Sequence, residues 1–274
     1  MKHKLVGSFL FLLVALTICF CQANPGKNTT SRRQNITVAG STSVLPFTEK
    51  LSEHFMIENP NFVVDVQGGG SSAGIQACIN HTVDIGMSSR DLKDAEKVLN
   101  EIVICYDGIG IIVNPRNSVR QITLEQVRAI YSGRIRNWKE LGWIDRQIDA
   151  VTREEGSGTR GAFEDLVMKK EEISQAIMVQ DSNGSVKEVV ATDPYAIGYI
   201  SLGMVDEKVR ALTIDGVAPT VQSITGKTYR IARPFLYLTL GQPSSKAQSF
   251  IGFVLSGPGQ DILKKEGLVA VHDF

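Results

Sequence analysis

The sequence predicts an α/β fold, and three observations lead to that class. Short apolar runs bounded by glycine or polar residues, as in strands, recur along the chain. Stretches with helical periodicity lie between them. Several strand-to-helix corners carry glycine, serine or threonine, which are residues that end strands and begin helices. Strands that alternate with helices indicate a layered α/β architecture and not a sandwich.

The expected elements follow this alternation from one end of the chain to the other. Pro46 fits the first turn of a helix, and Val63 to Val66 alternate as a strand does. Strands are predicted at 36–39, 62–66, 83–87, 148–151 and 196–200. Helices are predicted at 44–58, 73–79, 92–100, 124–131, 160–169, 186–192, 246–255 and 259–265, with a helical turn at 137–141. Two longer apolar runs, 102–113 and 230–240, can serve as crossovers between two lobes.

Composition excludes several classes of protein. The chain has 274 residues, of which 43% are hydrophobic and 21% are charged, enough for one large domain or two smaller ones. Its 29 basic and 29 acidic residues argue against a nucleic-acid-binding protein, which normally has a basic excess. The high apolar content excludes a disordered chain.

The N-terminus predicts an exported protein. Basic residues precede an apolar run at 5–20, and a small-residue site ending at Ala23 follows, so we expect a signal peptide over residues 1–23. An uncleaved anchor is one alternative. Lipidation at Cys19 or Cys21 is another, although bulky residues precede both cysteines.

Residues 24–34 are polar and without periodicity, which indicates a flexible tether. Removal of residues 1–23 leaves 27 basic and 29 acidic residues, a net charge of −2. An anion bound by the mature chain must therefore be held by a local group of residues. We expect a periplasmic or cell-surface location, with a membrane tether at the N-terminus as an alternative.

Two cysteines, Cys78 and Cys105, remain after the signal segment, and both lie in apolar surroundings. They are either two buried thiols or, in an exported protein, a disulfide. The scattered histidines have no ligand spacing, so we expect no metal site. Glycosylation sequons occur at Asn28, Asn35, Asn80 and Asn183 and weakly favour surface glycosylation.

Three strand-to-helix corners share one chemistry. They are residues 41–43 (Ser-Thr-Ser), 70–72 (Gly-Ser-Ser) and 156–159 (Gly-Ser-Gly-Thr). The first backbone N–H groups of a helix have no intrahelical partner and favour an oxyanion. Serine and threonine are also common helix N-caps, so one such corner alone is weak evidence. Three in one chain favour an anion site.

Two arginines lie beside these corners. Arg153 precedes the third corner, and its planar guanidinium suits bidentate contact with phosphate-like oxygens. The alternative for Arg153 is a surface ion pair with Glu154 or Glu155. Arg90, next to Ser88 and Ser89, carries the same ambiguity.

The third corner also matches other motifs. Gly156, Gly158 and Gly161 have the spacing of a dinucleotide-binding fingerprint, with Asp181 20 residues further on. Two glutamates in the same loop oppose a pyrophosphate there. Ala162 stands where a P-loop needs lysine, and Glu155 stands where a serine-hydrolase elbow needs glycine.

Four ordered motifs resemble one known family. They are VAGSTSVLP at 38–46, GGGSSAG at 68–74, TVDIGMSSR at 82–90 and REEGSGTR at 153–160, and ARPFLYL at 232–238 fits the same pattern. The mature chain is similar over its whole length to the phosphate-binding proteins of phosphate ABC transporters. The resemblance implies a two-lobed periplasmic-binding-protein type II fold with two crossover strands and one phosphate between the lobes.

The resemblance also implies the site residues. Phosphate contacts carry over to Thr42, Ser43, Ser71, Ser89, Arg153, Ser157, Gly158 and Thr159. One departure concerns Ser89, because many members have an aspartate there that accepts the proton of the bound phosphate. A carboxylate acceptor discriminates against sulfate, which has no proton to donate. The proton acceptor in this chain is therefore open.

Together these observations predict a binding protein and not an enzyme, with no catalytic residues and no cofactor. The expected lobes are residues 35–110 plus 229–274, and residues 111–228. The expected partners are inorganic phosphate and the membrane permease subunits of an ABC importer, with no nucleic acid, and the expected state is a monomer. The alternatives are a nucleotide-dependent enzyme that uses the Gly156–Gly161 loop, and a protein that binds another oxyanion.

Overall fold

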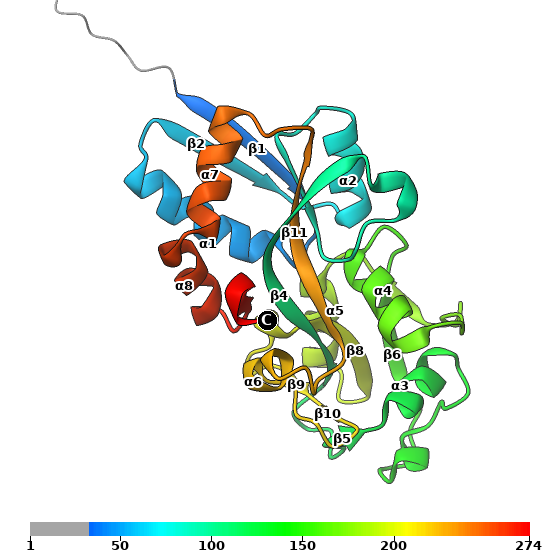
Figure 1. Ribbon diagram of the computed structural model, residues 1–274. Coiled ribbons are helices and arrows are strands. Elements are labelled where there is room, and N and C mark those ends of the chain that lie inside the picture. Colours follow the sequence, from blue (N-terminus) through cyan, green and yellow to red (C-terminus); the bar gives the residue numbers. More distant parts are fainter. Residues whose placement is uncertain (1–32) are drawn as a thin grey trace, which may run out of the picture. The chain divides into compact units, whose positions relative to one another are not determined.

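The computed structural model describes residues 33–274 as strands and helices in alternation (Figure 1). The predicted signal segment, 1–23, and most of the predicted tether, 24–34, lie outside the described residues. The strands are β1 (Gln34–Gly40), β2 (Phe62–Gln67), β3 (Ile85–Ser88), β4 (Leu99–Val113), β5 (Gln121–Ile122), β6 (Asp149–Arg153), β7 (Met178–Gln180), β8 (Ala196–Ser201), β9 (Arg210–Ala211), β10 (Thr213–Ile214), β11 (Ala232–Leu240) and β12 (Val269–Ala270).

The helices connect these strands. The α-helices are α1 (Leu45–Glu58), α2 (Ser71–Ile79), α3 (Leu124–Tyr131), α4 (Gly158–Phe163), α5 (Asn183–Thr192), α6 (Val221–Thr225), α7 (Ser245–Leu255) and α8 (Gly257–Lys265). Short turns of other helix types are η1 (Asp94–Glu96), η2 (Trp138–Leu141), η3 (Glu164–Met168), η4 (Leu202–Met204) and η5 (Val271–Asp273).

The main sheet runs in the order β2-β1-β3-β11-β4-β8-β6-β7. β1 is parallel to β2 and β3, and β6 is parallel to β7 and β8. Between these two parallel groups, β11 and β4 run antiparallel to each other and to the strands on either side. The carboxyl ends of the parallel strands therefore lead into the loops where an α/β protein binds its ligands.

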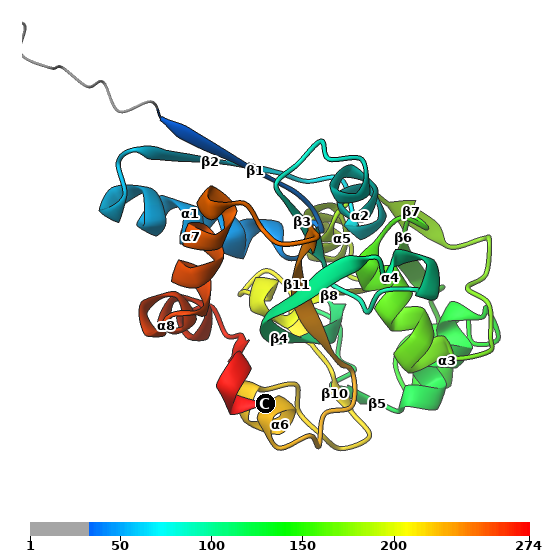
Figure 2. The same cartoon turned by 45° about the horizontal axis from the view of Figure 1, so that its top comes forward.

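β4 and β11 are the two crossover strands. Residues 99–108 of β4 pair with β11, and residues 109–113 of the same strand pair with β8. β11 pairs in turn with β3. β4 thus pairs with strands of both lobes, and β11 packs Ala232 against one hydrophobic core and Phe235 into the other. The two strands lie side by side between the lobes in both views (Figures 1 and 2). This arrangement confirms the two-lobed type II fold.

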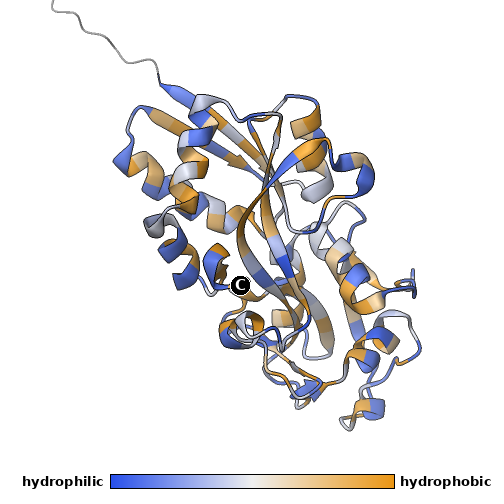
Figure 3. Ribbon diagram, in the orientation of Figure 1, coloured by the Kyte–Doolittle hydropathy of each residue, from blue (hydrophilic) through white to orange (hydrophobic). Residues whose placement is uncertain are grey.

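The lobes have separate hydrophobic cores. One core contains Phe47, Leu51 and Phe250 on the side of β1 and β3. The other contains Tyr131, Trp138 and other buried side chains around β8. Figure 3 shows hydrophobic residues along much of the sheet and both hydrophobic and hydrophilic residues around the helices. Each lobe buries its own apolar surface, so each has the means to keep its shape when the other moves.

Two predicted helices differ from the structure. Only residues 94–96 of the predicted helix 92–100 are helical, in η1, and β4 begins at Leu99. The predicted helix 160–169 is an α-helix only to Phe163, and the chain then widens into the π-helical turn η3. The first error arises because 92–100 is mostly polar and exposed, which satisfies helical periodicity without packing a helical face.

Cys78 and Cys105 are buried free thiols, and burial raises the pKa of each. The sequon residues Asn35 and Asn80 are exposed, but Asn183 is 0% exposed, so surface glycosylation at Asn183 is wrong. Asn28 lies outside the described residues. In the described range, 33–274, no helix is long and apolar enough to cross a membrane.

Candidate functional site

The three hydroxyl-bearing corners meet in one buried cluster. Ser41 Oγ, which follows β1, donates to Ser89 Oγ, which follows β3, at 2.8 Å. Ser43 Oγ and Thr159 Oγ1 lie 3.3 Å apart although 116 residues separate them. Ser71, at the start of α2, accepts a hydrogen bond from the backbone N–H of Ser89 at 3.1 Å. Residues from both lobes therefore meet in this cluster.

All eight predicted site residues belong to this region. Seven of the eight are buried, namely Ser43, Ser71, Ser89, Arg153, Ser157, Gly158 and Thr159, and Thr42 is half-buried. Buried hydroxyls are costly unless they are hydrogen-bonded, and these hydroxyls bond mainly to one another and to N–H groups. Buried serine and threonine side chains contribute little to a hydrophobic core, but their hydroxyls can donate hydrogen bonds to an anion.

The alternative reading of these corners as helix caps holds only for the third. Ser157 Oγ accepts from the Arg160 N–H and caps α4. The N-cap positions of α1 and α2 are Val44 and Gly70, and neither helix has a side-chain cap. The hydroxyls of the first two corners are thus not used to cap their helices.

Gly158 allows the corners to approach closely. A Cβ on this residue would lie 2.0 Å from Ser71 Oγ and 2.6 Å from Ser89 Oγ. A Cβ on Gly161 would likewise lie 2.9 Å from Arg90 Cδ. Close packing between the corners therefore accounts for two of the three glycines that match the dinucleotide-binding fingerprint.

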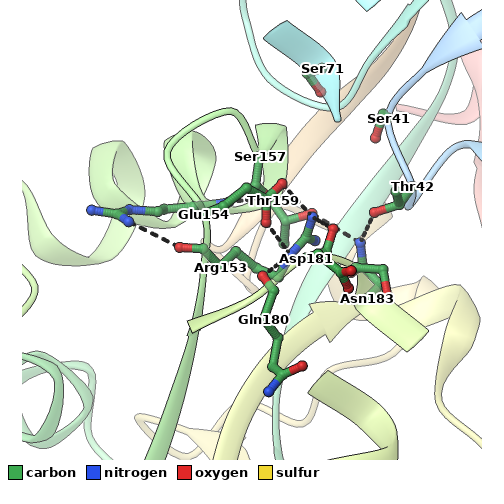
Figure 4. A network of polar contacts seen from close by, with 12 residues as sticks. Ser41, Thr42, Ser71, Arg153, Glu154, Ser157, Thr159, Gln180, Asp181 and Asn183 are labelled. Carbon is green, nitrogen blue, oxygen red and sulfur yellow. Dashed lines mark hydrogen bonds and ion pairs between the residues drawn. The ribbon is translucent and has the colours of Figure 1, made fainter. Parts of the chain in front are cut away.

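Arg153, the last residue of β6, is 1% exposed. Its Nε and Nη2 donate to both carboxylate oxygens of Glu154 at 3.0 and 2.9 Å, and also to the backbone oxygens of Gln180 and Asp181 (Figure 4). Its Nη1 is buried and has no hydrogen-bond partner within the described structure. The pairing with Glu154 was anticipated, but a surface location for Arg153 is wrong, because β6 carries the side chain into the interior.

Arg90 has a different role. Its guanidinium donates to both carboxylate oxygens of Glu96, at 2.7 and 2.9 Å, and also contacts Ser72 Oγ at 3.3 Å. The ion pair lowers the pKa of Glu96, with the hydrogen bonds from Arg90 as the largest cause. Of the two readings left open for Arg90, the structure shows the ion pair.

Sequence reasoning missed Asn183, the first residue of α5. Its Nδ2 donates to Thr42 Oγ1 at 3.2 Å and to Thr159 Oγ1 at 3.4 Å, and its Oδ1 accepts from the Ser201 N–H at 3.2 Å. Figure 4 shows its side chain next to that of Thr42. The only feature of the sequence that could have indicated a site role for Asn183 is its position after Ser182 at the start of a helix. The glycosylation sequon at Asn183 favoured a surface position instead.

Sequence reasoning also missed a buried ion pair behind the cluster. Arg233 Nη2 lies 3.1 Å from Asp107 Oδ2, and Arg233 Nη1 donates to the backbone oxygen of Ser89 at 3.1 Å. Ser201 Oγ donates to the other oxygen of Asp107 at 2.9 Å. Burial raises the pKa of Asp107.

Chemically, this arrangement suits a small tetrahedral oxyanion. Arg153 offers a guanidinium N–H, and the three corners offer hydroxyls from different directions. Charge-assisted hydrogen bonds of this kind are roughly twice as strong as neutral ones. The site contains oxygen and nitrogen groups that hold an anion, in a region that is largely shielded from solvent.

Comparison with known proteins agrees with this geometry. A family model described as a PBP superfamily domain matches residues 25–258. The phosphate-binding protein PstS of Bacillus subtilis is 32% identical over 100% of this chain and 96% of its own length. A putative phosphate ABC transporter substrate-binding protein from Clostridium perfringens, solved with bound phosphate, is 42% identical with a TM-score of 0.85, covering 87% of this chain and all of the other.

A third relative is an ABC-type phosphate transport receptor from Vibrio cholerae, with 36% identity, a TM-score of 0.72, and coverage of 85% of this chain and 99% of the other. The fold and the sequence matches define a binding protein of the PBP superfamily. Within that superfamily, the chain belongs to the family of PstS phosphate-binding proteins.

Proposed function

We propose that this protein captures inorganic phosphate between its two lobes outside the cytoplasm and delivers it to the permease of an ABC importer. The observation that carries the proposal is Arg153 Nη1, a buried donor without a partner among residues 33–274, beside hydroxyls that converge from both lobes. The relatives named for phosphate binding and phosphate transport support the choice of ligand.

The proposed ligand contacts are the predicted ones: Thr42, Ser43, Ser71, Ser89, Arg153, Ser157, Gly158 and Thr159. Their meeting in one buried cluster supports this assignment. Arg153 would supply charge, the side-chain hydroxyls would donate to phosphate oxygens, and Gly158 would permit the close approach of the corners. The relatives are binding proteins, and we propose that this chain likewise performs no catalysis.

The proposed lobes are residues 35–110 plus 229–274, and residues 111–228. The cores support the division into two lobes, because Ile36 and Phe250 share one core while Val127 and Tyr199 share the other. The bounds are not matched by the cores near the crossovers, where the core of the second lobe also contains Ile109, Tyr229, Ile231 and Val269. In this scheme the crossover strands act as the hinge. We further propose that the protein works as an exported monomer, tethered at the N-terminus if the signal segment is retained or lipidated.

Equilibrium dialysis of the mature chain against radiolabelled orthophosphate tests the proposal. We expect saturable binding of one phosphate per chain, displaced by unlabelled orthophosphate and unaffected by chloride at the same ionic strength. Binding that is not saturable, or that disappears with modest salt, would mean that the cluster is not a phosphate site.

A further inference from the structure

Five hydroxyls of the cluster accept hydrogen bonds from N–H groups. The donors are backbone N–H groups for three serines: Ser43 donates to Ser41 Oγ at 3.3 Å, Ser89 to Ser71 Oγ at 3.1 Å, and Arg160 to Ser157 Oγ at 3.2 Å. An N–H can only donate, so the direction of each bond follows from chemistry. A hydroxyl that accepts in this way keeps its own proton for donation, and Ser41 Oγ donates its proton to Ser89 Oγ at 2.8 Å.

The hydroxyls of Thr42 and Thr159 depend on a side chain instead. Both accept from Asn183 Nδ2. Asn183 is fully buried, and its Oδ1 accepts from the Ser201 N–H. Only the oxygen of an amide can accept from an N–H, so this contact fixes which end of the amide faces the threonines. One side chain thus orients hydroxyls from both lobes.

Two carboxylates beside the cluster, those of Glu154 and Asp107, already accept hydrogen bonds. Both oxygens of Glu154 accept from Arg153. Asp107 accepts from Arg233 on one oxygen and from Ser201 on the other. Among the described residues around the cluster, a bound anion therefore meets mainly donors. A proton on the anion would face these donors and lose hydrogen bonds.

We propose that Asn183 is a positioning residue that sets the hydroxyls of Thr42 and Thr159 as donors, so that the site takes the least protonated, doubly charged form of a tetrahedral oxyanion, sulfate as well as phosphate. This inference rests on the proposed function and narrows it. Phosphate affinity should rise with pH as the ligand loses its second proton near neutrality. Sulfate, already a dianion, should bind with an affinity that varies little between pH 6 and pH 8.

The decisive variant is Asn183→Asp, which keeps the size and shape of the side chain. The aspartate carboxylate can still accept from the Ser201 N–H. An oxygen, which only accepts, takes the place of Nδ2. The threonine hydroxyls then donate to this carboxylate and turn away from the ligand. We expect calorimetric titration at pH 8 to show at least tenfold weaker phosphate binding and a larger loss for sulfate. The increase of phosphate affinity with pH should become smaller, because a protonated phosphate can donate to the new carboxylate.

Three further variants keep the test informative. Asn80→Asp adds the same charge at an exposed asparagine of the first lobe and should leave both affinities and the pH profile unchanged. Thr42→Val, at a half-buried position, removes one oriented donor, and we expect it to weaken phosphate and sulfate severalfold alike. Thr42→Ser should restore most of that loss. The Thr42 variants test whether this hydroxyl donates to the anion even if Asn183→Asp fails to fold.

Several outcomes would overturn the proposal or the function on which it rests. An unaltered protein that binds phosphate and rejects sulfate would contradict the selectivity while leaving phosphate binding intact. A folded Asn183→Asp protein with unchanged affinity and pH profile would show that Asn183 does not orient the hydroxyls. If the unaltered protein binds sulfate but not phosphate, the proposed function fails and the donor site stands. If the unaltered protein binds neither anion, both the proposed function and the proposed role of Asn183 are wrong.

Discussion

Asp107 and Arg233 form an ion pair across the two crossover strands, with Arg233 Nη2 3.1 Å from Asp107 Oδ2 and both side chains almost fully buried. The two residues are register partners on β4 and β11. Arg233 also donates to the backbone oxygen of Ser89, next to the second corner. The pair therefore links the two crossover strands to the cluster that we propose binds phosphate.

Asp107→Asn should destabilise the protein strongly. The variant leaves the buried guanidinium of Arg233 without a countercharge, and breaking a buried pair in this way costs about 3–5 kcal/mol. Chemical denaturation followed by circular dichroism measures the loss. Asp65→Asn, at an exposed position of β2, is the matched control and should change the free energy of unfolding by less than about 0.5 kcal/mol. Equal stability of the two variants would argue against an ionised Asp107–Arg233 pair.

Arg153→Ala should weaken phosphate binding by roughly one to two decades, because a hydrogen bond to a charged group contributes about 1.5–3 kcal/mol. Arg153→Lys should recover only part of the affinity, since an ammonium cannot reproduce the planar fork. The side chain is buried, so a loss of stability should accompany the alanine variant. Calorimetry on the folded fraction separates the two effects. Full phosphate affinity in a folded Arg153→Ala protein would remove this residue from the site.

Gly158→Ala should block the approach of the corners. The new methyl group would lie 2.0 Å from Ser71 Oγ, far inside van der Waals contact, so the two lobes could not close around a ligand. We expect phosphate affinity to fall at least tenfold while the separate cores stay folded. Gly252→Ala, in α7 with open space around it, should bind phosphate normally and unfold at a slightly higher temperature. Normal binding by Gly158→Ala would contradict the contact between the corners.

Glu96→Gln should reduce stability at neutral pH and change its response to acid. The pKa of Glu96 is lowered in the folded protein by the hydrogen bonds from Arg90. Its contribution is therefore fully present above the unfolded value, about 4.3, and is lost as the pH falls through the folded pKa. We expect thermal unfolding at pH 7 and pH 3 to show a clear difference between variant and parent at pH 7 and a smaller one at pH 3. If the difference in thermal stability between variant and parent were the same at both pH values, the Arg90–Glu96 ion pair would not be its source.

The sequence predicts the corners and crossovers well because each depends on local patterns. Glycine and hydroxyl residues at a strand end, such as Gly70 and Ser71, define a corner whatever surrounds it. Asn183 and Asp107 could not be found in this way, since each depends on a partner that is distant in sequence. Thr42 is 141 residues from Asn183, and Arg233 is 126 residues from Asp107. The burial of Arg153 was missed for the same reason. Its neighbours Glu154 and Glu155 suggest a surface, and only the packing of β6 against β8 shows otherwise.

Calorimetric titration of the mature chain with orthophosphate and, separately, with NAD distinguishes a phosphate site from a nucleotide site. We expect saturable phosphate binding with one site per chain and no heat of binding for NAD beyond dilution. Tight NAD binding without phosphate binding would show that the protein is not a phosphate-binding protein and that the Gly156–Gly161 loop is a nucleotide site.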